Sequence, residues 1–315
     1  MRAQSLDDAI RSACHDVGIA VPRHVSPGKW AQSAVDGKAR SNKSGRVLIF
    51  DDEQGGIAWN WTTGQQQAFS LRGDPSAAVV IRPRQRDPDR DRRERDRREA
   101  VARICHDIVH SCRDDVHPYL ASKGFPDERA KVHDDPRCLL PRNELGDLLA
   151  GAMPTSDQPM LIVPGWIGDR VSTVQFITAS GEKKNILSGA MSGASYRIAT
   201  SPRNAQNSKE IVCEGFATAL SVRAAIRILN IPATIRSAFS ASNAAKVACA
   251  IPGAWIAADH DRPIEHLDGL GTGEFYARKS GCKWTMPASL GDFNDFHMEC
   301  GLRSVALHFR EVFIS

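Results

Sequence analysis

Two kinds of apolar pattern divide the first 80 residues. Apolar side chains first recur at helical spacing behind Ser5, a favourable N-cap, and so predict one amphipathic helix. The residues that set this spacing are Leu6, Ala9, Ile10, Ala13 and Val17. Short runs rich in Val, Ile, Trp and Phe then alternate with glycine-containing turns and predict strands over 46–50, 57–61 and 67–71. We therefore expect residues 1–80 to form a small, mostly β N-terminal module.

Residues 81–118 carry a different pattern, in which a run of charge gives way to an apolar stripe. The segment 82–99 holds nine arginines and six acidic residues, and opposite charges at short spacing favour a solvent-exposed helix. The alternative interpretation is that its arginines bind phosphate groups. Apolar residues continue the helical spacing as far as Cys112, before the His117-Pro118 pair. We expect a charged linker that leads into a packed helix.

Strands and helices are mixed in the rest of the chain. Over 119–205, the pattern predicts strands at 159–166, 170–177 and 185–187, a turn at 181–184 and a polar loop at 201–208. Over 206–315, strands at 210–213, 232–237, 254–258 and 282–286 alternate with helices at 217–229, 243–250 and 271–280. Such alternation is typical of a parallel, doubly wound sheet with helices on both faces. The expected fold class is therefore α/β.

The bulk composition is that of an ordinary soluble protein. The 315 residues are 42% hydrophobic and 25% charged, which is enough for a buried core and for two or three domains. A net charge of +4 is compatible with a nucleic-acid partner without requiring one. Eight cysteines without a C-x-x-C pair favour reduced, structural thiols in a cytoplasmic protein. No apolar stretch approaches the length of a membrane span, so no membrane partner is expected.

Three tryptophans, Trp30, Trp59 and Trp61, gather in the N-terminal module. Half-buried structural tryptophans are the interpretation we favour. A stacking surface for single-stranded nucleic acid is the alternative, since basic residues are interspersed with these rings. The basic residues are Lys29, Lys38, Arg40, Lys43 and Arg46.

Acidic residues stand where three predicted strands end. Glu214 follows the strand at 210–213, and Asp259 and Asp261 follow the strand at 254–258. Asp292 and Asp295 come after the strand at 282–286. The carboxyl ends of parallel strands meet at one edge of a sheet, so these side chains are expected to converge. Clustered carboxylates repel one another unless cations lie between them, and all-oxygen ligands favour Mg²⁺ or Mn²⁺ and phosphoryl chemistry.

Four ordered segments carry a resemblance to a known family. They read EGFATALS from Glu214, AFSASN from Ala238, AADHD from Ala257 and DFND from Asp292. Together they resemble the acidic signatures of Toprim domains. Their residues are most similar to those of the primase-like proteins of phages and conjugative plasmids. The HPYLASKG segment from His117 is similar to the segment that opens the catalytic core of those proteins, and the resemblance covers roughly 115–300.

The resemblance implies a fold and a function. It implies a Toprim-type parallel sheet flanked by helices over 206–315, preceded by a basic mixed α/β primase-core subdomain over 119–205. The implied activity is that of a DNA primase-like nucleotidyltransferase, which joins NTPs into short RNA primers on single-stranded DNA during phage or plasmid replication. A separate replicative helicase is the partner that such a protein would meet.

The resemblance also implies roles for single residues. Glu214 would be the general acid/base, and Asp259, Asp261, Asp292 and Asp295 would surround Mg²⁺ or Mn²⁺. Four basic residues would face template or nucleotide phosphates, although each could equally be an ordinary surface charge. These are Lys123, Arg170, Lys183 and Lys184.

Departures from the family pattern keep two alternatives open. Thr218 stands where replicative primases usually carry an aspartate four residues after the glutamate. No Cys/His set in 1–80 has the spacing of a zinc-binding module, and no Walker A motif indicates a fused helicase. A Toprim metal-dependent nuclease is one alternative function, and a catalytically idle DNA-binding replication accessory protein is the other.

Overall fold

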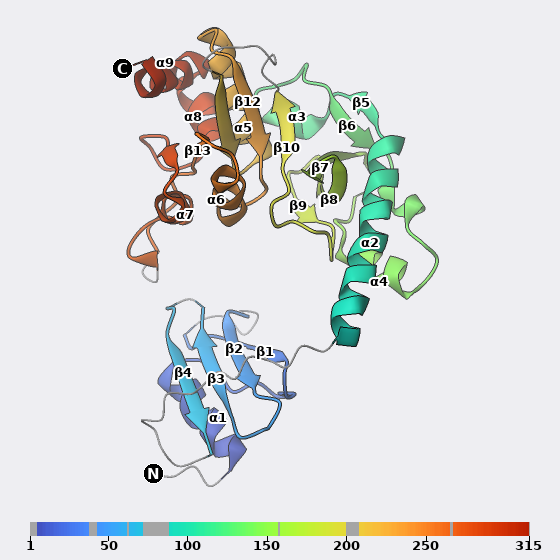
Figure 1. The fold of residues 1–315 in the computed structure, drawn as a ribbon, viewed down its shortest axis with the longest axis vertical. Coiled ribbons are helices and arrows are strands. Elements are labelled where there is room, and N and C mark those ends of the chain that lie inside the picture. Colours follow the sequence, from blue (N-terminus) through green and yellow to red (C-terminus); the bar gives the residue numbers. More distant parts are fainter. Residues whose placement is uncertain are drawn as a thin grey trace. The chain divides into compact units, whose positions relative to one another are not determined.

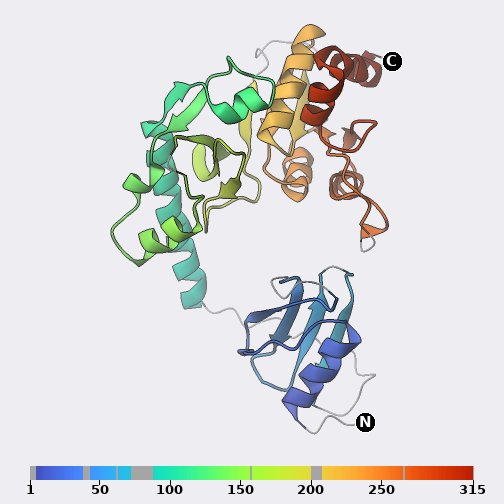
Figure 2. The same ribbon diagram turned by 180° about the vertical axis from the view of Figure 1, so that it is seen from behind.

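The computed structural model describes residues 5–37, 43–61, 63–71, 88–156, 158–199, 208–264 and 267–314. The chain divides into two compact units, Met1–Arg86 and Asp87–Ser315, and each is described by itself. Among the described helices, none combines the length and the apolar character needed to cross a lipid bilayer. Figures 1 and 2 show the elements of both units from opposite sides.

The N-terminal unit is a four-stranded antiparallel sheet with one helix against it. Helix α1 (Leu6–Asp16) begins at the Ser5 cap, whose hydroxyl accepts a hydrogen bond from the Asp8 amide at 3.2 Å. The sheet follows chain order, with β1 (Trp30–Ser33), β2 (Gly45–Ile49), β3 (Gly55–Asn60) and β4 (Gln66–Ser70). Alternate strand residues, including Val47, Ala58 and Phe69, pack on the apolar face of α1. The strand β1 was not expected from the sequence.

A long helix, α2 (Pro88–Ser111), opens the second unit. Its C-terminal half is the packed helix expected from the sequence, because Val101, Cys105 and Ile108 are buried against residues of strand β8. Residues 91–99 of its charged half are exposed to solvent. The part of the charged segment before residue 88 lies outside the described residues.

A five-stranded antiparallel sheet follows α2. Its order is β5 (Arg113–Asp115), β6 (Ala130–His133), β7 (Met160–Ile167), β8 (Arg170–Ile177) and β9 (Lys183–Asn185). The short elements α3 (Pro118–Ser122), η1 (Pro136–Leu139) and α4 (Glu144–Ala152) connect these strands. The structure corrects one local expectation, because Lys183 and Lys184 belong to strand β9 and not to a turn. They pair with Ile177 and Phe176. The turn between β8 and β9 therefore ends before Lys183, whereas the sequence predicted a turn over 181–184.

The C-terminal sheet has the order β10-β12-β11-β13-β14. Strands β11 (Lys209–Cys213), β12 (Ala233–Ser237), β13 (Trp255–Ala257) and β14 (Lys283–Thr285) are parallel, as expected for a doubly wound sheet. The edge strand β10 (Tyr196–Ala199) was not expected and runs antiparallel to β12. Although β10 precedes residue 205, where a boundary was expected, it belongs to the C-terminal sheet. Most of the expected polar loop at 201–208 lies outside the described residues.

Helices cover both faces of the C-terminal sheet (Figures 1 and 2). Helices α5 (Phe216–Ile228), α8 (Phe293–Cys300) and α9 (Leu302–Ile314) share a core with Ile211 and Ala257. Helices α6 (Ala241–Cys249) and α7 (Thr272–Ser280) pack on the alternate strand residues Val212 and Ile256. Apolar residues on successive positions of one strand are therefore buried on opposite faces, which explains why these strands read as continuous apolar runs.

The two sheets of the second unit share a hydrophobic core. Tyr119 and Leu120 of α3 are buried together with Leu161 and Ile177 of the antiparallel sheet and with Phe216 of α5. An ion pair between Arg223 of α5 and Glu128, with N–O distances of 3.0 and 2.5 Å, adds a second link. The antiparallel sheet is thereby fixed against the start of α5, which directly follows Glu214.

Candidate active site

Three of the parallel strands place a carboxylate near their carboxyl ends. Glu214 follows β11 directly, Asp259 lies two residues beyond β13, and Asp292 is the N-cap of α8, after β14. Strands β11, β13 and β14 are neighbours in the sheet. Their carboxyl ends therefore share one edge, which is where sites form in open α/β sheets.

The electrostatics of Glu214 and Asp259 indicate that these carboxylates meet. Burial is the main cause that raises the pKa of Glu214 to about 6, and the charges of Asp261 and Asp292 add to it. Burial likewise raises the pKa of Asp259 to about 8, with the Glu214 charge as the next cause. Asp292 and Asp261 act on Asp259 in the same direction. The acids from three separate segments thus form one electrostatic cluster.

Asp259 carries an atom without a partner. Its Oδ1 is buried, and no described group of the protein donates a hydrogen bond to it. Helix α7 packs closely on the backbone of Asp259. A Cβ on Gly273 of this helix would lie only 2.2 Å from the Asp259 carbonyl oxygen, so the contact requires a glycine. A buried carboxylate oxygen that lacks a donor is costly unless a proton or a cation satisfies it.

Asp261 is held by the first turn of α7. Its Oδ2 accepts a hydrogen bond from the Gly273 amide at 2.9 Å. The N-cap of α7, Gly271, has no side chain to make that bond itself, and a Cβ there would lie 2.5 Å from the Asp261 carbonyl oxygen. The helix N-terminus carries a partial positive charge, and this contact fixes the position of the Asp261 carboxylate beside it.

Asp292 and Asp295 form a reciprocal cap at the start of α8. Oδ1 of Asp292 accepts from the amides of Asn294 at 2.6 Å and Asp295 at 2.9 Å. The Asp295 carboxylate in turn accepts from the Asp292 amide at 3.1 Å, which completes a capping box. Asp295 is exposed, whereas Asp292 is half-buried and accepts a further hydrogen bond from Thr218 at 3.0 Å. The structure brings Asp292 into the acidic cluster and gives Asp295 a capping contact.

The four basic residues singled out from the sequence have different surroundings. Lys183 on β9 is brought to the acids, because its positive charge lowers the pKa values of both Glu214 and Asp259. Arg170 makes a two-point ion pair with Glu99 of α2, with N–O distances of 2.9 and 2.6 Å. Lys184 pairs with Glu182 at 2.9 Å. Both of these pairs are exposed, so they leave the two cations accessible to solvent.

Lys123 belongs to a contact that the sequence did not reveal. Its carbonyl accepts a hydrogen bond from Nδ2 of Asn294 at 2.8 Å, and the same nitrogen donates to Ser221 at 3.1 Å. The next residue, Gly124, has a φ of +85°, and a Cβ there would lie 2.8 Å from the sulfur of Met298. The HPYLASKG segment is therefore docked on α8, beside the cap that holds Asp292. The similarity of the HPYLASKG segment to the family was the only sequence signal that this segment contributes to the site.

The clustered carboxylates suit a divalent cation that takes only part of its ligands from the protein. In the described part of the chain, no group of three or more His, Cys, Asp or Glu side chains is arranged to enclose a metal ion. Magnesium commonly takes only one or two carboxylates and keeps water or phosphate oxygens as its other ligands. The unpartnered Oδ1 of Asp259, with Glu214 beside it, suits that mode of binding. The residues present therefore fit a cation held jointly with a phosphate-bearing substrate.

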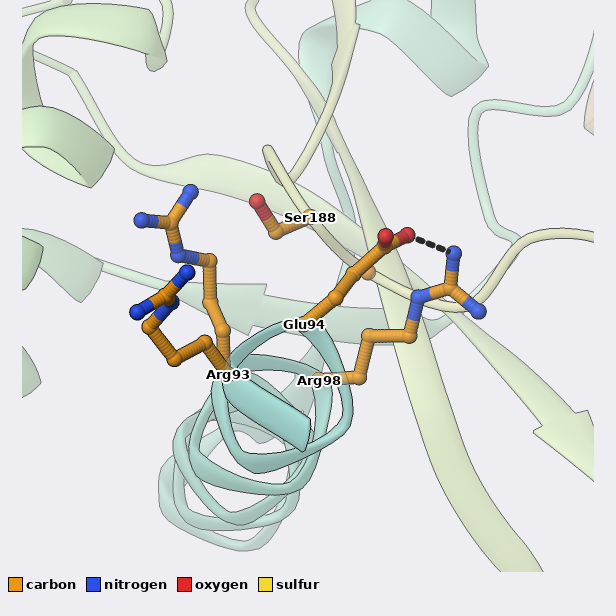
Figure 3. Close-up of a pocket in the computed structure, with 6 residues that line it drawn as sticks. Arg93, Glu94, Arg98 and Ser188 are labelled. Atoms are coloured by element: carbon orange, nitrogen blue, oxygen red, sulfur yellow. Dashed lines mark hydrogen bonds and ion pairs between the residues drawn. The ribbon is translucent and has the colours of Figure 1, made fainter. Parts of the chain in front are cut away.

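A separate pocket of about 490 Å³ lies along helix α2 (Figure 3). Glu94 and Arg98 pair with each other across one turn of the helix, as the dashed line in Figure 3 marks. None of the clustered acids Glu214, Asp259, Asp261 and Asp292 lines this pocket. Its lining consists of Arg93, Glu94, Arg97, Arg98, Ser188 and Gly189.

Comparison with known proteins gave few matches. No protein-family model matches the sequence, and no curated protein matches it significantly. A solved structure of the DnaG primase catalytic domain bound to single-stranded DNA has a TM-score of 0.41 and 13% identity, covering 69% of this chain and 80% of that one. The Aquifex aeolicus primase structure with zinc-binding and RNA polymerase domains has a TM-score of 0.39 and 12% identity, covering 98% and 86%. Likenesses at this level do not identify the function of this chain.

Proposed function

We propose that this chain is a metal-dependent, primase-like nucleotidyltransferase that joins ribonucleotides into short RNA primers on single-stranded DNA. One observation carries the proposal. Glu214 and Asp259 stand at neighbouring strand ends with raised pKa values, and Oδ1 of Asp259 is buried without a donor. Such a cluster is suited to a cation that is shared with phosphate oxygens. The motif resemblance supplies the reaction class and the setting of phage or plasmid replication.

Glu214 is the residue that we assign to proton transfer. A general acid/base works best when its pKa lies near the pH of the reaction, and burial moves the pKa of Glu214 to about 6. Its role would be to take the proton from the attacking 3′-hydroxyl. The negative charges of Asp261 and Asp292 keep this carboxyl more basic than an exposed glutamate would be.

Asp259, Asp261 and Asp292 are the residues that we assign to Mg²⁺ or Mn²⁺, and Asp295 supports them by capping α8. When bound, the cation would neutralise charge that develops on the transferred phosphate. Asp261 is held in place by the Gly273 amide, and Asp292 by two amides and the Thr218 hydroxyl. These contacts fix the carboxylates before any ligand arrives, which limits the reorganisation that binding requires.

Lys183 is the basic residue that we assign to substrate phosphates at this site. Its charge acts on both Glu214 and Asp259, so it lies within electrostatic reach of the cluster. An incoming NTP brings several negative charges to the carboxylates, and a lysine beside them offsets part of that repulsion. Lys123, Arg170 and Lys184 are assigned to a more distant template contact.

A primer-synthesis assay tests the proposal. The chain is incubated with single-stranded DNA, labelled NTPs and Mg²⁺ or Mn²⁺, and the products are separated by length. We expect short labelled RNA from the wild type and from Glu299→Gln, an exposed control on the same helix as Asp295. Glu214→Gln and Asp259→Asn should lose the product. Cleaved DNA without RNA would replace the proposal by the nuclease alternative, and bound DNA without either product would replace it by the accessory alternative.

A further inference from the structure

The N-terminal sheet has two faces of different character. One face packs on α1 and holds Val47, Ile49, Ala58 and Phe69 in its core. The other face carries the intervening strand residues. Along β2, buried residues of the first face alternate strictly with half-buried residues of the second face. In a half-covered antiparallel sheet the outer positions are expected to be polar. Here the outer positions of β1 and β3 instead include two tryptophans.

Three tryptophan rings form a continuous row on this outer face. The ring centroids of Trp30 and Trp59 are 6.2 Å apart, and those of Trp59 and Trp61 are 5.7 Å apart. Trp30 is 46% exposed and Trp61 is 45% exposed. The indole nitrogen of Trp59 lies buried between them, without an acceptor among the described residues. A contiguous aromatic surface that faces solvent is a mark of a binding site.

The charge around this tryptophan row is positive. The guanidinium of Arg46 lies 3.9 Å from the ring centre of Trp61, and its Nη1 donates to the carbonyl oxygen of Gly45 at 2.9 Å. Lys29 and Lys43 are exposed beside Trp30 and Arg46 in the sequence. The described strand residues of this face include no carboxylate. They are Trp30, Gln32, Arg46, Leu48, Gly55, Ile57, Trp59, Gln66, Ala68 and Ser70.

Three acidic residues of the same hairpin lie away from Arg46. Asp51, Asp52 and Glu53 lie in the turn between β2 and β3. That turn is at the opposite end of the hairpin from Arg46, which pairs with Trp59. The β2–β3 hairpin therefore separates its negative turn from Arg46, Trp59 and Trp61.

We propose that this face binds single-stranded nucleic acid. Bases stack on the exposed rings of Trp30 and Trp61, and Arg46 with its neighbouring lysines contacts the phosphate backbone. Stacking on aromatic side chains requires unpaired bases whose faces are free, which selects single strands over duplexes. The inference stands on the N-terminal unit alone and does not depend on the activity proposed for the acidic cluster.

A protein partner is the main rival occupant, because tryptophan and arginine are also enriched at protein interfaces. The core of such interfaces is depleted of charge, whereas here the Arg46 guanidinium is stacked on the exposed Trp61 ring, and two exposed lysines stand near the row in the sequence. A polyanion with flat, apolar bases satisfies both features at once. This complementarity favours nucleic acid.

The test is a binding titration with the full chain. A fluorescently labelled single-stranded oligodeoxynucleotide is followed by anisotropy in the presence of a chelator, so that chemistry at the acidic cluster cannot contribute. Trp30→Ala and Trp61→Ala are each expected to weaken binding roughly tenfold, as loss of one stacked base does. Val21→Ala removes an equally exposed apolar side chain, at 46%, from outside the sheet and should leave affinity unchanged. Circular dichroism verifies that every variant is folded.

A second measurement locates the contact directly. An oligodeoxynucleotide that carries iodouracil is irradiated with the full chain, and the crosslinked peptides are mapped by mass spectrometry. Crosslinks at Trp30 or Trp61, with tighter binding of single strands than of a blunt duplex, support the proposal. Wild-type affinity in the Trp30→Ala/Trp61→Ala double variant, or crosslinks confined to residues 87–315, overturns it. Equal affinity for the blunt duplex also overturns it, and would leave a protein partner as the occupant of the face.

Discussion

Thr218 donates a hydrogen bond to Oδ2 of Asp292 at 3.0 Å and so ties helix α5 to the cap of helix α8. The Thr218 side chain is 1% exposed. Oδ1 of Asp292 accepts from two backbone amides. Both oxygens of this carboxylate are therefore held by the chain, while its charge raises the pKa values of Glu214 and Asp259.

Replacing Thr218 by valine tests this tie. The substitution keeps the shape of the side chain, removes the donor and leaves Oδ2 of Asp292 without its partner. We expect a loss of about 1–2 kcal/mol in the free energy of unfolding, because a half-buried acceptor becomes unsatisfied. Chemical denaturation measures it, with Thr218→Ser as the control that retains the hydroxyl. A valine variant as stable as the wild type would show that the bond contributes nothing.

Asp259→Asn is expected to stabilise the chain when no metal is present. Folding raises the pKa of Asp259 to about 8, whereas an aspartate in an unfolded chain titrates near about 4. The folded state therefore keeps a proton that the unfolded state releases, and stability falls as pH rises from about 4 to about 8. The asparagine variant lacks this titration, so its advantage should grow over the same interval, to roughly 1–3 kcal/mol.

Thermal unfolding in a chelator, at several pH values, measures this advantage. Added Mg²⁺ should raise the melting temperature of the wild type more than that of Asp259→Asn, which reduces the advantage that the variant has in the chelator. Glu299→Gln, exposed on α8, serves as the control and should follow the wild type. An advantage of Asp259→Asn that is the same at every pH would argue against the buried, proton-holding carboxylate.

Gly273→Ala should disturb the acidic cluster. A Cβ there would lie 2.2 Å from the carbonyl oxygen and 2.9 Å from the amide nitrogen of Asp259, and backbone cannot move aside as a flexible side chain can. We expect destabilisation of about 1–3 kcal/mol from overpacking, with loss of primer synthesis. Gly151→Ala in α4 meets no atom within 4 Å, so it should stabilise its helix slightly. Equal effects of the two substitutions would contradict the close packing of α7 on Asp259.

The acids at the strand ends were predictable because parallel strands that neighbour in a sheet bring their carboxyl ends together. Glu214, Asp259 and Asp292 needed only an alternation of strands and helices to be placed at one edge. The cap between Asp292 and Asp295 was not predicted, because helix α8 was not expected after the strand at 282–286 and both residues were assigned to the metal. The sequence does not say which of the two carboxylates joins the cluster, since that depends on Thr218, far away in the chain.

Other features could not be predicted because their partners are distant in sequence. Arg170 is paired with Glu99, which lies 71 positions earlier. The edge strand β10 is short and precedes a polar loop, and it exists because β12 offers it a free edge. Lys183 looked like a turn residue beside Gly181, yet its pairing with Ile177 makes it part of β9. In each case tertiary contacts overrode the local pattern.

Cys249 and Cys282 provide a check on the packing of the end of α6 beside the segment that joins α7 to β14. Their sulfurs lie 3.8 Å apart, although the residues are 33 positions apart in sequence. We expect oxidised glutathione to join them, with two thiols converted to one disulfide while glutathione disulfide is reduced to two thiols. Mass spectrometry of the digested chain detects the linked peptides, and Cys282→Ser should abolish them. Cysteines linked in random pairs would contradict the arrangement of this sheet and its helices.

The central claim is that Asp259 and its neighbours bind a divalent cation, and the most direct test is electron paramagnetic resonance of Mn²⁺. Free Mn²⁺ gives a strong signal that weakens on binding, so titration of the full chain counts the bound ions. We predict binding by the wild type and by Glu299→Gln, and its loss in Asp259→Asn, with primer synthesis lost in the same variant. Binding by Asp259→Asn equal to that of the wild type would contradict the assignment of the metal to this cluster.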